Sequence, residues 1–152
     1  MSVLVIGVGN PDRGDDGAGR EVVNRLRRIA PEGTEFVELS GEAAGLLALF
    51  ETASAAVIID ASRSGAPAGA IRRFDAAAEP LPGGFLAFSS HGFGPAAAIE
   101  LARTLGVLPP KCVVFAVEGE RFDIGAPITQ AVSVALDDVV ERISRELSVA
   151  DD

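Results

Sequence analysis

The N-terminal part of the chain reads SVLVIGVGNPDRGDDGAG from Ser2 to Gly19, and this stretch indicates how the fold begins. It opens with an apolar, largely β-branched run over 2–8, which is typical of a buried strand, and a glycine-rich loop follows. From about Gly17 to Ala30, apolar residues including Ile29 recur at helical spacing and charged residues fill the other face. We expect an amphipathic helix there, with acidic residues at its start and Pro31 ending it.

The remaining chain continues this alternation of strands and helices. Further strands are expected over 34–39, 55–61 and 111–118, a possible edge strand over 70–75, a short strand or turn over 85–88, and helices over 43–52, 93–105 and 129–147. Because the main strands are apolar throughout, both faces of their sheet should be covered. The pattern therefore predicts an α/β three-layer fold with a largely parallel sheet of about five strands between helices. Neither a repeat nor a linker interrupts it, so we expect a single domain over 1–152.

Composition excludes several classes of protein. An apolar content of 48% in 152 residues is too high for intrinsic disorder. The net charge of −9 argues against nucleic acid or an anionic membrane as partner. No transmembrane segment or signal peptide is recognisable, so we expect a cytoplasmic protein, and in the absence of an exposed heptad we expect a monomer. The single cysteine, Cys112, lies in an apolar run and is expected to be a core residue and not a nucleophile.

Three residues form the candidate site. In sheets of this kind, ligands bind at the carboxyl ends of the strands. Asp16 follows the first strand, Asp60 ends the third, and His91, the only histidine, follows the segment 85–88. Two carboxylates and one imidazole are a common ligand set for a divalent transition metal. Each residue also has an ordinary alternative: Asp16 as a helix cap, Asp60 as a strand end bonded to its own backbone, and His91 as a loop residue.

The adjacent Asp15 is expected to have a different role from Asp16. Neighbouring residues at a helix start diverge by about 100°, so the two carboxylates cannot easily bind one ion. We expect Asp15 to cap the helix or to accept a hydrogen bond from the Gly9–Asn10 loop.

Two other chemistries are disfavoured by the same segments. A dinucleotide site needs its third glycine at position 12, which is an aspartate, and a pyrophosphate would meet two carboxylates at the helix start. Ser89 and Ser90 adjoin His91, but the chain lacks a G-x-S-x-G elbow. Adjacent residues on a strand also point to opposite faces, so the histidine is poorly placed to activate its neighbour.

Five short blocks together closely resemble the hydrogenase maturation endopeptidase family. They are Gly7-Val8-Gly9-Asn10, Asp15-Asp16-Gly17-Ala18-Gly19, Val57-Ile58-Ile59-Asp60-Ala61, Ser90-His91-Gly92-Phe93-Gly94 and Val117-Glu118-Gly119, and the likeness runs from Val3 to about Ile143. The resemblance implies a mixed sheet between helices, in a phosphorylase/hydrolase-like arrangement. It also implies a metal-dependent, aspartic-type endopeptidase that removes the C-terminal extension of a [NiFe]-hydrogenase large-subunit precursor.

The resemblance further implies where the metal binds. The family's metal-contacting residues map onto Asp16, Asp60 and His91, and the nickel they contact is supplied by the substrate. This chain departs from the family at Asp12-Arg13, where an aliphatic residue is frequent, and at Ser40-Gly41-Glu42, where many members carry an acidic residue. These departures should affect the rim that meets the substrate. They leave open an alternative function, in which the chain is a metal-sensing chaperone or a degenerate paralogue that docks on the precursor without cutting it.

Overall fold

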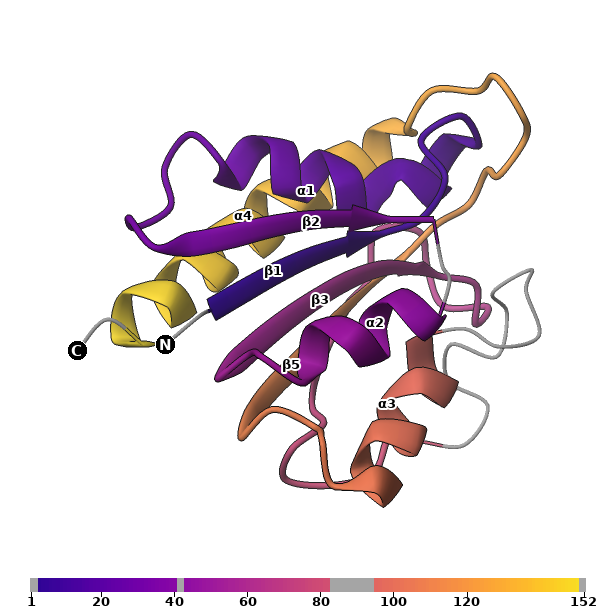
Figure 1. Cartoon of the computed structure of the whole chain (residues 1–152). Coiled ribbons are helices and arrows are strands. Elements are labelled where there is room, and N and C mark those ends of the chain that lie inside the picture. Colours follow the sequence, from indigo (N-terminus) through magenta and orange to yellow (C-terminus); the bar gives the residue numbers. More distant parts are fainter. Residues whose placement is uncertain (1–2, 41–42, 83–94, 151–152) are drawn as a thin grey trace.

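The computed structural model describes residues 3–40, 43–82 and 95–150 of the chain (Figure 1). Strands and helices alternate along most of it, as the sequence predicts. In chain order they are β1 (Val3–Val8), the short 3-10 helix η1 (Gly14–Gly17), α1 (Ala18–Leu26), β2 (Thr34–Leu39), α2 (Ala43–Phe50), β3 (Ala55–Ser62), β4 (Ile71–Asp75), α3 (Pro95–Leu105), β5 (Lys111–Glu118) and α4 (Gln130–Ala150).

The strands form one mixed sheet of five strands in the order β2-β1-β3-β5-β4. β1, β2, β3 and β5 are parallel, and β4 pairs antiparallel with β5 at the edge. The predicted edge strand and the predicted largely parallel, mixed sheet are therefore confirmed. The parallel strands all end on one side of the sheet, to the right in Figure 1, and the loops that follow them gather there.

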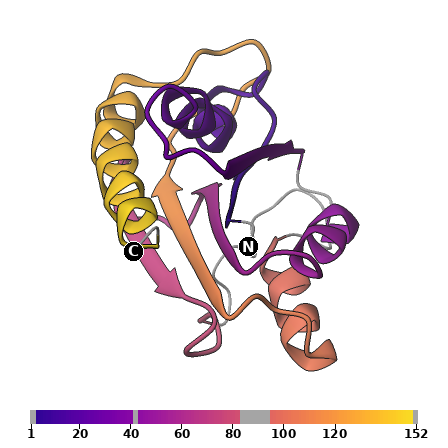
Figure 2. The same cartoon turned by 60° about the vertical axis from the view of Figure 1, so that its left-hand side comes forward.

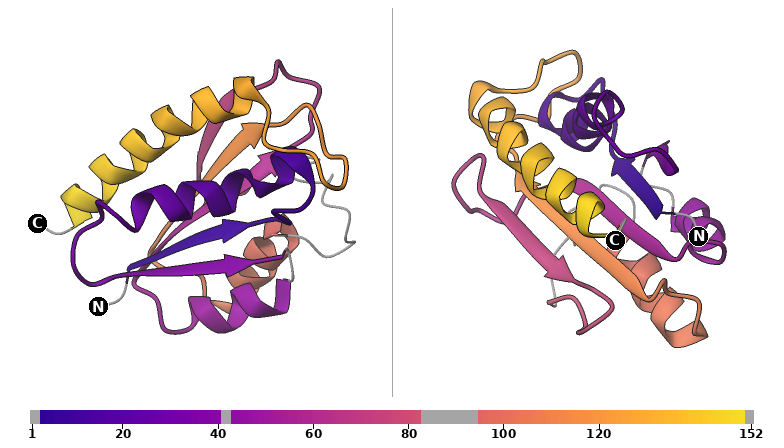
Figure 3. Two further views of the ribbon diagram at one scale, coloured as in Figure 1. Left: turned by 90° about the horizontal axis from the view of Figure 1, so that it is seen from above. Right: turned by 90° about the vertical axis from the view of Figure 1, so that its left-hand side faces the viewer.

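Helices cover both faces of this sheet (Figures 2 and 3). Alternate strand residues point to opposite faces. Val5, Val57 and Phe115 pack in one hydrophobic cluster with α1 and α4. Their neighbours Ile6 and Ile58 pack in a second cluster with α2 and α3. The three-layer arrangement is thus produced by strands that are apolar on both faces.

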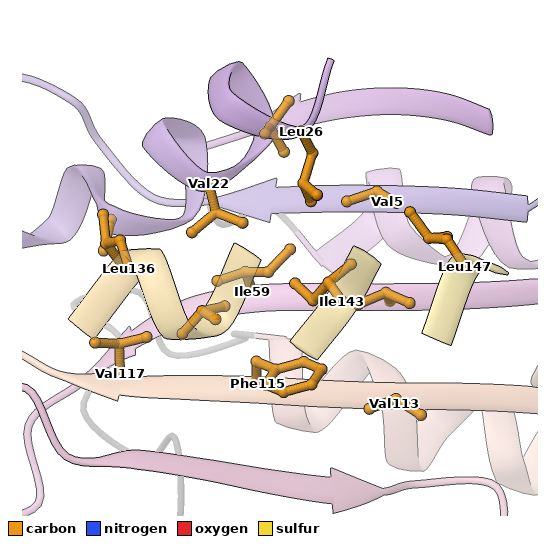
Figure 4. Close-up of a cluster of buried hydrophobic side chains, with 14 of the residues drawn as sticks. Val5, Val22, Leu26, Ile59, Val113, Phe115, Val117, Leu136, Ile143 and Leu147 are labelled. Carbon is orange, nitrogen blue, oxygen red and sulfur yellow. The ribbon is translucent and has the colours of Figure 1, made fainter. Parts of the chain in front are cut away.

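The cluster under α1 and α4 shows how the two helices are held (Figure 4). Leu136, Ile143 and Leu147 of α4 lie on one stripe and belong to the same cluster as Val5 of β1 and Phe115 of β5. Val22 and Leu26 of α1 are both 0% exposed in the same cluster. Burying each such side chain stabilises the fold by about 1.5 to 3 kcal/mol. The predicted apolar stripe of the C-terminal helix is confirmed.

Two details of the helices differ from the prediction. α1 ends at Leu26 and not near Ala30, because the backbone N–H groups of Ile29 and Ala30 both turn back to the Leu26 carbonyl. Ile29 is consequently 57% exposed and does not pack as expected. On α3 the expected packing residues are divided: Ile99 and Ala102 are buried, whereas two leucines face outward, Leu101 at 37% and Leu105 at 61% exposure.

Cys112 is a core residue, as predicted. It is 0% exposed on β5, and burial raises the pKa of its thiol to about 12. No helix in the described part of the chain combines the length and the apolar character needed to span a membrane.

Candidate functional site

The site lies where β1, β3 and β5 end. The loop after β1 and the loop between β5 and α4 lie side by side at this edge (Figures 1 and 3). Several backbone hydrogen bonds join them, including Asp15 N–H to the Arg121 carbonyl at 2.7 Å and Gly125 N–H to the Asp12 carbonyl at 2.7 Å. The β3–β4 loop is tied to the same place, since Gly119 N–H donates to the Ser62 carbonyl at 3.0 Å.

Asp16 is presented by η1, and the loop after β1 folds back onto it. One of its carboxylate oxygens, Oδ2, accepts a hydrogen bond from Asn10 N–H at 2.8 Å. This approach requires glycine at position 9, where φ is +135° and a Cβ atom would lie 1.9 Å from the Asp16 carbonyl oxygen. Asp16 and not Asp15 therefore bonds the Gly9–Asn10 loop, which corrects our expectation. Neither carboxylate caps α1, whose N-cap position is Gly17 without a side-chain hydrogen bond.

Asp60 lies near the carboxyl end of β3, two residues after Ile58 and on the same sheet face. It is only 6% exposed. Burial, and then the negative charge of Asp16, raise the pKa of the Asp60 carboxyl to about 8, opposed by a hydrogen bond from the Ala61 backbone. The fold therefore brings Asp16 and Asp60 within electrostatic range of each other, although 44 residues separate them. A carboxyl whose ionisation is opposed by a neighbouring carboxylate in this way belongs to a site that a cation would stabilise.

His91 lies outside the described residues, as do Ser89, Ser90, Gly41, Glu42 and the predicted segment 85–88. Within the ranges 3–40, 43–82 and 95–150, no group of three or more His, Cys, Asp and Glu side chains is arranged to hold a metal ion. The structure thus brings together two of the three predicted residues, and the position of the third stays a prediction.

Asp15 has a role that the sequence did not reveal. Its side chain is 0% exposed. Its carboxylate accepts hydrogen bonds from the backbone N–H groups of Glu120, Arg121 and Thr129 at 2.8 to 3.1 Å. The hydroxyl of Thr129 also lies 3.0 and 3.1 Å from the two carboxylate oxygens and donates to this carboxylate. Asp15 therefore fastens the β5–α4 loop to the segment that carries Asp16.

Glu118 is a second buried carboxylate that sequence reasoning did not assign. It ends β5, is 3% exposed, and accepts hydrogen bonds from the hydroxyls of Ser62 and Ser64 at 3.0 and 2.8 Å. The backbone N–H groups of Ser64 and Gly65 also donate hydrogen bonds to this carboxylate, at 2.9 and 3.2 Å. The signal in the sequence was a carboxylate directly after the apolar run over 112–117. Its function is to fix the end of β3 and the loop that follows, close to Asp60.

Comparison with known proteins agrees with this architecture. The family model described as "Hydrogenase maturation protease" matches residues 20–146. A candidate hydrogenase maturation protease of Methanocaldococcus jannaschii is 27% identical over 152 residues, which cover 95% of this chain and 96% of that protein.

Solved structures show the same fold. The Escherichia coli hydrogenase maturating endopeptidase HybD superposes with a TM-score of 0.81 at 23% identity, covering 99% of this chain and 94% of that one. The [NiFe] hydrogenase maturation protease HycI of Thermococcus kodakarensis gives a TM-score of 0.72 at 19% identity, covering 97% and 92%.

Proposed function

Because the chain belongs to the hydrogenase maturation protease family, we propose that it is a nickel-dependent endopeptidase. Its substrate is the nickel-loaded precursor of a [NiFe]-hydrogenase large subunit, from which it removes the C-terminal extension. The observation that carries this proposal is the convergence of Asp16 and Asp60, with the pKa of Asp60 raised to about 8, at the carboxyl edge of the sheet.

The donor set suits a nickel ion that arrives with the substrate. Asp16 and Asp60 would contribute carboxylate oxygens and His91 an imidazole nitrogen, a mixture that divalent transition metals accept. His91 precedes Pro95, the first residue of α3, by four positions, and α3 packs on the sheet face that Asp60 shares. The ion would polarise the scissile carbonyl or lower the pKa of a water molecule.

The two carboxylates account for dependence on the ion. Without a cation, burial and the charge of Asp16 keep Asp60 largely protonated near neutral pH. A divalent cation would relieve the repulsion between the two groups, so that both could be ionised at once. The site would then be complete only when the correct substrate has docked.

The test is the shortening of a purified precursor, followed by gel electrophoresis. Wild-type enzyme should shorten nickel-loaded precursor and leave nickel-free precursor intact. His91→Ala and Asp60→Asn should each lose at least about 100-fold in rate, because the remaining donors would hold the ion poorly. The matched control is Asp138→Asn, which removes an exposed carboxylate on α4 that pairs with Arg142 at 3.0 Å.

Two outcomes would contradict the proposal. Efficient cleavage of nickel-free precursor by the wild type would overturn nickel recognition. Tight binding of nickel-loaded precursor without any shortening would favour the non-catalytic alternative, a metal-sensing chaperone that docks on the precursor.

A further inference from the structure

The rim beside the candidate site is held by hydrogen bonds from two buried carboxylates. Asp15 and Glu118 hold the loops after β5 and β3 with hydrogen bonds from backbone and hydroxyl groups. On the β5–α4 loop that Asp15 fixes, Ile124 is 84% exposed. Loops that a scaffold holds in place frequently carry the residues that bind another molecule.

Phe122 of this loop is contacted by two arginines from the other loops of the rim. The guanidinium of Arg63, just after β3, lies over the Phe122 ring at 4.5 Å from its centroid. Arg13, from the loop after β1, donates through Nε to the Phe122 carbonyl at 3.4 Å. A guanidinium stacked on an aromatic ring keeps its in-plane N–H groups free to bind a carboxylate through two hydrogen bonds.

These two arginines differ from most arginines of this acidic protein. Seven arginines pair with carboxylates within the described ranges: Arg25, Arg27, Arg73, Arg103, Arg121, Arg142 and Arg145. Arg13 and Arg63 form no ion pair with any described residue.

The acidic side chains of the rim do not neutralise Arg13 and Arg63. Asp123 pairs with Arg121 at 3.1 Å. Neither Asp12 nor Glu120 forms an ion pair with them in the part of the chain that the structure describes. In a chain with 22 acidic residues, two guanidiniums that meet at Phe122 and form no ion pair within the described residues point to a carboxylate on another molecule.

We propose that Arg13 and Arg63, held against Phe122, dock an acidic side chain of the large-subunit precursor beside Asp16 and Asp60. This inference rests on the proposed function and names a contact that selects its substrate. Arg13 belongs to the Asp12-Arg13 departure from the family pattern, so the contact would distinguish this enzyme's substrate from those of relatives with an aliphatic residue there.

The experiment measures KM and kcat for cleavage of nickel-loaded precursor by wild type, Arg13→Gln, Arg63→Gln and the double variant. Each single substitution should raise KM by about tenfold and the double more, with a much smaller effect on kcat, because the contact forms on docking. The dependence of KM on salt concentration should weaken in parallel. The matched control is Arg28→Gln, an exposed arginine just beyond the carboxyl end of α1, which should behave as wild type.

A charge exchange identifies the partner group. Arg63→Glu should bind the precursor poorly, and changing one acidic precursor residue to lysine should restore its KM toward the wild-type value. A double variant with KM within about twofold of wild type, and with unchanged salt dependence, would overturn the docking contact while leaving the endopeptidase assignment intact. If wild type does not shorten the precursor, the endopeptidase assignment fails, and precursor affinities are compared instead. Equal affinities of wild type and double variant then overturn the contact.

Discussion

At the scale of single residues, Asp15 and Asp16 are neighbours with unrelated roles. Asp15 is 0% exposed and has its hydrogen-bonding capacity filled by the β5–α4 loop. Asp16 is only partly buried. Within the described residues, its carboxylate accepts a hydrogen bond from Asn10 N–H. Asp15 thus has little capacity left for a metal ion, whereas Asp16 keeps an oxygen available beside Asp60.

The raised pKa of Asp60 predicts how stability depends on pH. The carboxyl titrates near pH 3.8 in the unfolded chain and near 8 in the folded protein. Between these values the folded state holds a proton that the unfolded state has lost, so this group lowers the free energy of unfolding as the pH rises. Asp60→Asn should remove this effect. Relative to wild type, the variant should gain stability from about pH 4 to about pH 8, by at most roughly 6 kcal/mol.

Urea unfolding at several pH values measures this difference. Asp138→Asn, an exposed aspartate that pairs with Arg142, serves as the control and should follow the wild-type curve closely. Parallel stability curves for wild type and Asp60→Asn would show that the Asp60 carboxyl titrates normally.

At the scale of elements, the site depends on how closely α1 approaches the sheet. Gly19 in the first turn of α1 faces the backbones of β1 and β3. A Cβ atom there would lie 2.4 Å from the Ile59 carbonyl oxygen and 2.8 Å from the Val8 N and O atoms. Ile59 directly precedes Asp60. The close packing of α1 against Ile59 therefore also influences the position of Asp60.

Gly19→Ala should therefore destabilise the protein by at least about 2 kcal/mol, because α1 must move away from the strands. Gly45→Ala is the matched control, since Gly45 lies inside α2 and the nearest atom to its added Cβ is Leu39 Cδ2 at an ordinary 3.5 Å. That substitution should stabilise the protein by about 0.5 to 1 kcal/mol through helix propensity. Chemical denaturation compares the two, and equal stability of both variants would refute the close approach.

At the scale of the whole molecule, the sheet unites two hydrophobic cores. β5 pairs with both β3 and β4, and its side chains enter both clusters. Opening either face of this strand would disrupt the packing of the molecule as a whole, so we expect cooperative unfolding.

Cys112 provides a probe of that cooperativity. Its thiol is 0% exposed with a pKa of about 12, so a thiol-specific reagent should not react with the folded protein at neutral pH. Labelling should begin only at urea concentrations where the helical circular dichroism signal is lost, and fully unfolded protein should react as a free cysteine does. Rapid labelling without urea would indicate local opening of β5.

The sequence by itself determined the elements and the class of fold. Periodicity and apolar runs report local burial, which is why β2 at Thr34–Leu39 and β5 at Lys111–Glu118 coincide with the predicted segments. The order of apolar strands and helices also placed Asp16 and Asp60 at the carboxyl edge of a parallel sheet, so both could be named in advance as candidate residues. The sequence predicted the end of α1 at Leu26 less accurately, because backbone hydrogen bonds determine the turn that follows it.

Only the tertiary structure decided the partners of the polar residues. Asp15 binds groups 105 to 114 residues later in the chain, and Glu118 binds the loop at Ser62 to Gly65. Such contacts require β1, β3 and β5 to be neighbours in the order β2-β1-β3-β5-β4. A local pattern of polar and apolar residues carries no information about that order, because it shows that a face is buried but not which distant segment covers it.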